Sequence, residues 1–156
     1  MIWRTSIPYL FLAAMTCCVL AIMLDKADAS PKRLQALQSM DGWHERKNRK
    51  ALQSRLGVNP ARVPWCGYAV AYAVKKAGGT PVKGYSKASN WKRFGKGVKL
   101  SQARKGDIVV IRTKRGHHVS VYSHRAKGRV CLRGGNQSNR VKVSCYRASS
   151  VRAVRR

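Results

Sequence analysis

The chain has 156 residues, and its charge is strongly one-sided: 33 Lys and Arg stand against 5 Asp and Glu, for a net charge of +28. The first 29 residues carry two charges of each sign, so residues 30–156 keep only three carboxylates. This scarcity excludes mechanisms that need several acidic groups. The length predicts one domain with a modest core, and the 44% hydrophobic content is that of a folded protein rather than a disordered basic tail.

Residues 1–29 have the features of a targeting segment. Arg4 precedes an uncharged run over 7–24, and the sequence ADA at 27–29 is the small-x-small pattern that precedes a cleavage site. We expect a cleaved signal peptide. The alternative is an uncleaved membrane anchor, because the run of 18 residues approaches the ~20 that span a bilayer. In both cases residues 30–156 are expected outside the cytoplasm, in the periplasm, in the cell wall or secreted.

Three helical segments are predicted in the first part of the chain. The first covers 31–56, and Asp41 and Gly42 divide it into a stretch that includes Leu34, Leu37 and Met40 and a second stretch over 45–56. The second covers 66–77, where small and apolar residues recur at the spacing of one buried helical face, so this Ala-rich helix can pack closely. The third is a shorter helix over 86–94.

The second part of the chain has the pattern of strands. Four strands are predicted, at 108–111, at 119–122, and in a hairpin formed by 129–133 and 140–146. Helices therefore come first and an antiparallel sheet follows, without βαβ alternation and without an internal repeat. This order predicts an α+β fold.

The cysteines divide between the targeting segment and the expected domain. Cys17 and Cys18 lie in the apolar run, which leaves Cys66, Cys131 and Cys145 in an environment that permits disulfides. The predicted hairpin places Cys131 opposite Cys145, at the ~4.5–5.5 Å that separates directly paired residues. We expect a disulfide there, with Cys66 as the remaining thiol. The alternative is that all three are small buried hydrophobic residues without a bridge.

The three carboxylates of residues 30–156 do not form a convincing catalytic pair. They are Asp41, Glu45 and Asp107. A glycosidase needs two carboxylates that face one another. Asp107 follows a glycine where a turn enters a strand, so a local turn role explains it. Glu45 is expected in the first turn of a helix, where the helix dipole favours an acid.

The sequence also offers few residues that could bind a metal ion or a cofactor. Three of the four histidines, His117, His118 and His124, would have to converge without an acidic ligand nearby in the sequence. The chain has no glycine-rich phosphate loop of either common type. We therefore expect no metal and no cofactor.

A thiol nucleophile with a histidine base is the chemistry that the remaining residues allow. Cys66 lies at the start of a predicted helix, where backbone N–H groups and the surrounding cations favour the thiolate. His118 begins a predicted strand and Asn136 lies in the turn of the following hairpin, so an antiparallel sheet can bring them together. Each residue also has an ordinary alternative, because Cys66 can be a packing residue and His118 can be solvated.

Four motifs follow one another in the expected domain: PWCGYAV at 64–70, KGDIVV at 105–110, HVSVY at 118–122 and GGNQSN at 134–139. Their order resembles that of the NlpC/P60 and CHAP cysteine peptidases of bacteria and phages. The resemblance is greatest to a small subgroup with a Trp-Cys helix start and a Gly-Gly-Asn-Gln-Ser-Asn loop. It extends from about residue 42 to about residue 151.

This resemblance implies a single papain-like α+β domain over 30–156 that hydrolyses amide bonds of peptidoglycan, as an endopeptidase or an N-acetylmuramoyl-L-alanine amidase. It implies Cys66 as nucleophile, His118 as general base and Asn136 as the polar residue that orients the base. Two alternatives stay open. His117 stands beside His118, and Gln137 stands beside Asn136. The enzyme would serve in bacterial wall remodelling or as a phage lysin.

The net charge predicts polyanionic partners. A charge of +28 attracts peptidoglycan stem carboxylates, teichoic acids or lipopolysaccharide, and it attracts nucleic acid without sequence specificity. A membrane contact is expected only through the N-terminal segment, and the protein is expected to be a monomer. The alternative function is a non-catalytic cationic protein that binds envelope polyanions or nucleic acid on a degenerate peptidase scaffold. A membrane-permeabilising cationic protein is a third possibility.

Overall fold

The structure is a computed structural model, and it describes residues 29–156. The predicted targeting segment lies outside the described residues except for its last one, Ala29. No helix within the described range has the length and apolar character needed to cross a membrane. The elements of this range are α2 Ala29–Gln38, α3 Arg49–Leu56, α4 Cys66–Lys76, the 3₁₀ helix η1 Ala88–Arg93, the 3₁₀ helix η2 Leu100–Gln102, β1 Ile108–Thr113, β2 Gly116–Ala126, β3 Arg129–Gly134, β4 Lys142–Arg147, the 3₁₀ helix η3 Ala148–Ser150 and β5 Val151–Arg155.

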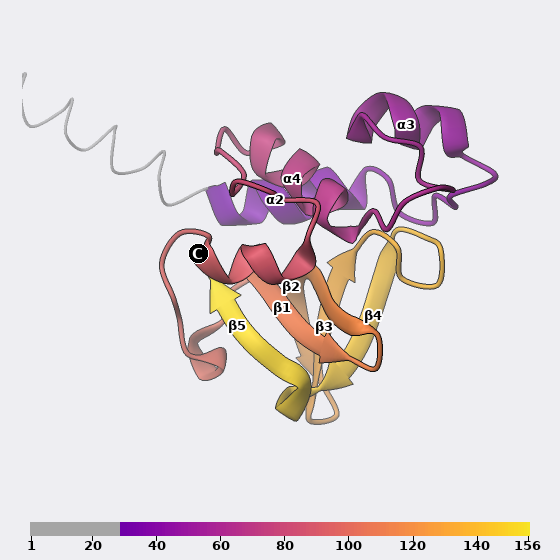
Figure 1. The fold of residues 1–156 in the computed structure, drawn as a ribbon. Coiled ribbons are helices and arrows are strands. Elements are labelled where there is room, and N and C mark those ends of the chain that lie inside the picture. Colours follow the sequence, from indigo (N-terminus) through magenta and orange to yellow (C-terminus); the bar gives the residue numbers. More distant parts are fainter. Residues whose placement is uncertain (1–28) are drawn as a thin grey trace, which may run out of the picture.

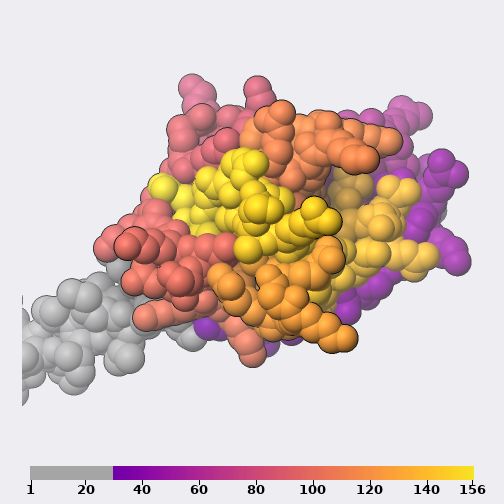
Figure 2. All heavy atoms as spheres, turned by 90° about the horizontal axis from the view of Figure 1, so that it is seen from below, coloured from indigo at the N-terminus to yellow at the C-terminus, as the bar shows by residue number. Residues whose placement is uncertain are grey.

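The strands form one antiparallel sheet in the order β4-β3-β2-β1-β5. The first four strands are neighbours both along the chain and in the sheet, and β5 returns to pair with β1 at the other edge. The three α-helices lie together on one side of this sheet (Figure 1). Figure 2 shows the molecule from below, where the C-terminal residues in yellow lie between segments drawn in orange. Helices followed by an antiparallel sheet confirm the predicted α+β fold.

Several elements differ from the sequence prediction. The strand expected over 119–122 extends over 116–126. The helix expected from residue 45 begins at Arg49, because residues 45–48 form turns instead. The helix expected over 86–94 is the 3₁₀ helix η1. The sequence does not predict β5, whose short sequence VRAVR becomes a strand only through its pairing with β1.

Hydrophobic clusters cover both faces of the sheet. The larger cluster lies between the helices and the sheet and includes Trp65, Val70 and Val110. The smaller cluster lies on the other face and includes Val109 and Leu132. Adjacent residues of β1 thus enter different clusters, as the two-residue period of a strand requires. The continuous apolar run of β1 is typical of a strand buried on both faces, and this packing holds α4 against the sheet.

Candidate active site

The predicted nucleophile, Cys66, is the first residue of α4, and its side chain is 7% exposed. It is the free cysteine of the described residues. Burial raises the pKa of the Cys66 thiol, and hydrogen bonds from the backbone N–H groups of Val119, Gly67 and Cys66 itself oppose this effect. The sequence predicts a lowered pKa at the helix start. In the structure, the effect of desolvation on the pKa is larger than the opposite effect of the helix start. The side chain of Cys66 is therefore a neutral thiol in the free protein.

The predicted base, His118, directly precedes Val119, whose backbone N–H contacts the Cys66 sulfur, so the thiol approaches β2 next to the backbone of this histidine. His118 Nε2 lies 2.8 Å from Ser120 Oγ. Burial lowers the pKa of His118 to about 4, although a hydrogen bond with the Gln137 side chain raises it. The imidazole is therefore neutral at neutral pH and can accept a proton.

Tyr146 on β4 lies close to both groups. Its ring centroid is 6.3 Å from that of His118. Burial raises the pKa of the Tyr146 hydroxyl, a hydrogen bond with Ser144 lowers it, and the charge of ionised Cys66 raises it further. An electrostatic effect of this kind requires Cys66 and Tyr146 to be near each other. Side chains from α4, β2 and β4 therefore share one neighbourhood.

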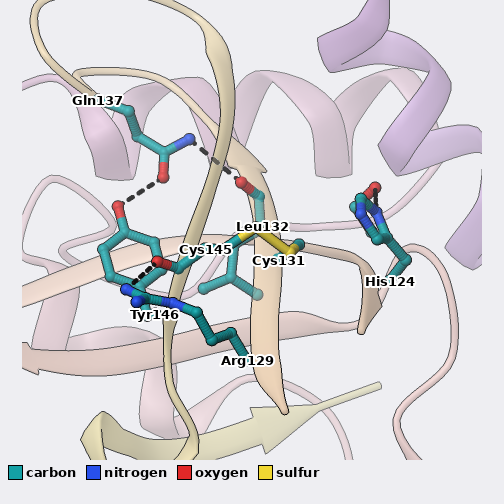
Figure 3. Close-up of a disulfide and its surroundings, with 8 residues drawn as sticks. His124, Arg129, Cys131, Leu132, Gln137, Cys145 and Tyr146 are labelled. Atoms are coloured by element: carbon teal, nitrogen blue, oxygen red, sulfur yellow. Dashed lines mark hydrogen bonds between the residues drawn. A yellow bond between two sulfur atoms is a disulfide. The ribbon is translucent and has the colours of Figure 1, made fainter. Parts of the chain in front are cut away.

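The side chain of Gln137 is 4% exposed and is oriented by its neighbours (Figure 3). Its Nε2 donates to the backbone oxygen of Leu132 at 3.2 Å and to that of Lys142. Its Oε1 accepts a hydrogen bond from the Tyr146 hydroxyl at 2.7 Å. The backbone carbonyl groups occupy the amide nitrogen of Gln137. Its amide oxygen can therefore accept a hydrogen bond from an N–H group of His118, and this bond selects the imidazole tautomer.

The structure brings Gln137, rather than the predicted Asn136, to the imidazole. Asn136 has a left-handed backbone with φ 58°, and Ser138 and Asn139 also have positive φ. Asn adopts this conformation more readily than most residues. The backbone of the turn directs the side chain of residue 137 inward, while Asn136 is only half-buried. The structure therefore favours Gln137 for the orienting position.

His117 lies in a different environment from His118. As its neighbour on β2, it points to the other face of the strand. Desolvation lowers the pKa of His117, and the charges of Lys92 and Arg112 lower it further. The contact with Gln137 belongs to His118. This arrangement favours His118 over His117 as the base.

The Gly-Gly pair at the start of the turn lets the chain approach the site closely. A Cβ atom at Gly135 would lie 2.4 Å from the ring of Trp65, and one at Gly134 would lie 2.2 Å from Ser120 Oγ. Both distances are shorter than any real contact of a Cβ atom, so larger residues would push the turn away from α4 and β2. The glycines of the GGNQSN motif are therefore explained by packing.

Glu45 connects Trp65 to the same turn. Its carboxylate accepts a hydrogen bond from Trp65 Nε1 at 3.2 Å, and its backbone N–H donates to the oxygen of Asn139 at 2.9 Å. The expected place of Glu45 in the first turn of a helix is wrong, because α3 begins at Arg49. The other two carboxylates of residues 29–156 form the ion pairs Asp41–Arg133 and Asp107–Arg156.

All three carboxylates of residues 29–156 thus have structural partners. The described residues also contain no group of three or more His, Cys, Asp or Glu side chains that could hold a metal ion. The site consists of a thiol, an imidazole, an amide and a phenol, and these groups suit nucleophilic attack with proton transfer.

A disulfide joins Cys131 on β3 to Cys145 on β4 (Figure 3). The two residues are paired in the β3–β4 register, with their Cα atoms 4.0 Å apart. Leu132 and Tyr146 follow them directly, and both contact the Gln137 side chain. The bridge therefore ties together the two strands that orient Gln137.

Sequence analysis does not identify Ser120 and Tyr146 as parts of the site. Ser120 stands two residues after His118, so strand periodicity places both on one face and is a usable signal. For Tyr146 no such local signal exists. Its approach to Gln137 depends on the register of β4 against β3 and on the path of the turn between them.

Comparisons with known proteins identify solved structures with a similar fold but no relative by sequence. The sequence matches no protein-family model and no curated protein. The P60 domain of antigen MAP1272c from M. avium paratuberculosis superposes with a TM-score of 0.56 at 16% identity, over 87% of this chain and 98% of that one. A structure of RipA, a resuscitation promoting factor interacting protein, gives 0.56 at 16% identity, over 83% of this chain. This chain covers 62% of that RipA chain, less than two thirds of its length.

Proposed function

We propose that this chain, which shares the fold of the NlpC/P60 superfamily, is a cysteine hydrolase that cleaves amide bonds of peptidoglycan. The observation that supports the proposal is the Cys66 thiol at the start of α4 in contact with the Val119 backbone, together with a neutral His118 imidazole that contacts the oriented Gln137 amide. Three of the four sequence motifs that resemble this superfamily contain these residues, one in each motif. The fold and the motifs therefore support one chemistry.

In the proposed reaction, His118 takes the proton of the Cys66 thiol as the sulfur attacks the carbonyl carbon of the amide. The backbone N–H of Cys66 at the start of α4 donates to the oxyanion of the tetrahedral intermediate. His118 then gives the proton to the leaving amine, and a thioester remains. A water molecule that His118 deprotonates hydrolyses the thioester, which releases the carboxylate and restores the thiol. Gln137 keeps the imidazole oriented through both proton transfers.

The proposed place of action is outside the cytoplasm, after export by residues 1–29 as a signal peptide or an anchor. The net charge of +28 supports this proposal, because cell envelopes are polyanionic and a cationic enzyme accumulates on them. Cell-wall remodelling by a bacterium and lysis by a phage are the two settings in which such an enzyme works.

The test compares the full-length protein with its Cys66→Ser variant on purified peptidoglycan. The wild type is expected to release new amino groups, and the variant is expected to lose at least about a thousandfold in rate, because a serine hydroxyl is a far weaker acid than a thiol and gives up its proton much less readily in a site built around sulfur. Mass spectrometry of the released fragments then distinguishes the two activities: an amidase frees the first alanine of the stem, and an endopeptidase cuts within the stem. Equal release by both proteins would contradict the proposal and favour the non-catalytic cationic binder.

A further inference from the structure

A second surface, separate from the candidate active site, lies over α2, α3 and α4. Two adjoining hollows of about 540 Å³ and 450 Å³ share Tyr72 and Lys76. Arg55 and Lys75 line the first hollow. We call this surface the Tyr72 groove, defined by Arg55, Tyr72, Lys75 and Lys76. Lys75 stands nine residues after Cys66 on α4, so the groove lies ~14 Å along the helix from the thiol.

The cations of the Tyr72 groove are held in place by aromatic rings. The Arg55 guanidinium lies 4.5 Å from the ring centroid of Trp43 and 6.0 Å from that of Tyr72. The Lys76 ammonium lies 5.9 Å from the same Tyr72 ring. An aromatic face restrains a cation without neutralising its charge. These side chains therefore present positive charge in fixed positions, unlike the mobile lysines of an ordinary solvated face.

The groove also lacks acidic groups of its own. The described residues that line the two hollows include no carboxylate. The three carboxylates of residues 29–156 are engaged elsewhere, with Arg133, with the Trp65 indole and with Arg156. Arg55 Nη1 donates a hydrogen bond to a neutral hydroxyl, that of Ser39, at 3.0 Å. The charge of the groove is thus available to an anionic ligand.

The chemistry of the groove fits a polymer that carries repeated phosphates. Arginine and lysine are the usual partners of phosphate oxygens, and the hydroxyl of the exposed residue Ser54 adds a neutral donor. Tyr72 is the one aromatic residue among the described residues that line the two hollows, whereas proteins that bind single-stranded nucleic acid combine a basic groove with several rings for successive bases. One ring beside fixed cations suits a chain of sugars or polyols joined by phosphodiesters.

We propose that the Tyr72 groove binds a phosphodiester polymer of the bacterial cell wall and holds the hydrolase on its substrate layer. This inference rests on the proposed function for its setting, because the wall is where a peptidoglycan hydrolase meets such a polymer. The groove and the thiol lie at opposite ends of α4. Both can therefore be occupied at once, and binding to the polymer leaves the candidate active site open.

The chain offers a matched control for this proposal. A third hollow is lined by residues 46–51 and contains Arg46, Lys47, Arg49 and Lys50 without an aromatic ring. The groove variant carries Arg55→Glu, Lys75→Glu and Lys76→Glu, and the control variant carries Arg46→Glu, Lys47→Glu and Lys50→Glu. Both triple variants change the net charge equally. Circular dichroism and thermal unfolding verify that each variant is folded.

The experiment measures binding of the full-length proteins to soluble poly(glycerol phosphate) at about 0.15 M salt, where long-range attraction is screened. The groove variant is expected to bind about tenfold or more weakly than wild type, and the control variant within about threefold of it, because three direct phosphate contacts are lost only in the first. Tyr72→Leu, which keeps the charge and the apolar contacts, is expected to weaken binding severalfold. Equal losses of affinity in the two triple variants would overturn the proposal, since the net charge alone would then explain the binding.

Two further arms separate the outcomes. Single-stranded DNA of equal charge is expected to bind the wild type more weakly than poly(glycerol phosphate) does. If DNA binds more tightly, and the groove variant loses this binding, the choice of polymer is overturned. On a small soluble muropeptide without phosphate, the groove variant is expected to keep wild-type cleavage. Failure of the proposed function would instead appear as equal cleavage by wild type and Cys66→Ser, whatever the polymer binding.

Discussion

At the scale of single residues, burial determines the protonation states of the site. Desolvation raises the pKa of Cys66 and lowers that of His118, so both groups are neutral at rest. The sequence predicts that the Cys66 thiolate is favoured at the start of α4. The structure places both groups where a charge is poorly solvated, which favours a neutral pair with proton transfer during attack.

The pH dependence of kcat/KM follows from these shifts. The lowered pKa of His118 keeps its imidazole neutral above about pH 4, so activity should persist through mildly acid pH and fall only as His118 is protonated near pH 4. The raised pKa of Cys66 moves the alkaline limb above the usual thiol range. Initial rates on a soluble muropeptide over about pH 3–10 test this expectation. An acid limb near the ordinary histidine value of ~6.5 would contradict it.

A pair of neighbouring substitutions tests which residue orients the base. Gln137→Ala should lower kcat by roughly 10- to 100-fold with little change in KM, because the imidazole loses the acceptor that selects its tautomer. Asn136→Gly should leave kcat within about threefold, since glycine tolerates the positive φ at this position. Steady-state kinetics on the same substrate measure both. A larger loss of kcat for Asn136→Gly than for Gln137→Ala would indicate that Asn136, and not Gln137, orients the base.

At the scale of elements, the site lies where one helix start, one strand and one hairpin turn meet. α4 supplies Cys66, β2 supplies His118, and the turn between β3 and β4 supplies Gln137. The turn is held by Glu45 and by the close packing of Gly135 on Trp65. Each element is ordinary by itself. Their contacts place the three functional groups together.

The hairpin gives a stability prediction for its disulfide. Replacing Cys131 and Cys145 by alanine should lower the free energy of unfolding by about 3 kcal/mol, because the bridge closes a loop with a sequence separation of 14. Urea unfolding monitored by circular dichroism measures the difference. Dithiothreitol provides the control: it should destabilise the wild type by a similar amount and leave the double variant unchanged. An unchanged wild type under reducing conditions would contradict a stabilising bridge.

At the scale of the whole molecule, the three side-chain carboxylates of residues 29–156 serve the fold, and most Lys and Arg residues of this range face the surroundings. Asp107 is fully buried, and its oxygens accept hydrogen bonds from Arg156 at 3.0 and 2.8 Å, which fastens the last residue beside the start of β1. Asp41 and Glu45 connect the segment after α2 to β3 and to Trp65. The remaining positive charge covers the surface, and in the Tyr72 groove aromatic rings hold part of it in place.

The sequence by itself determined the order of helices and strands, the cysteine at a helix start and the pairing of the hairpin, because periodicity and turn residues are local properties. The tertiary structure decided between neighbours. Asn136 and Gln137 carry the same functional group, and only the positive φ values of the turn direct one of them inward. Burial, which set the charge of Cys66 and His118, and the approach of Tyr146 depend on residues far away in the chain. Local patterns cannot contain that information, since desolvation and register arise when the elements pack together.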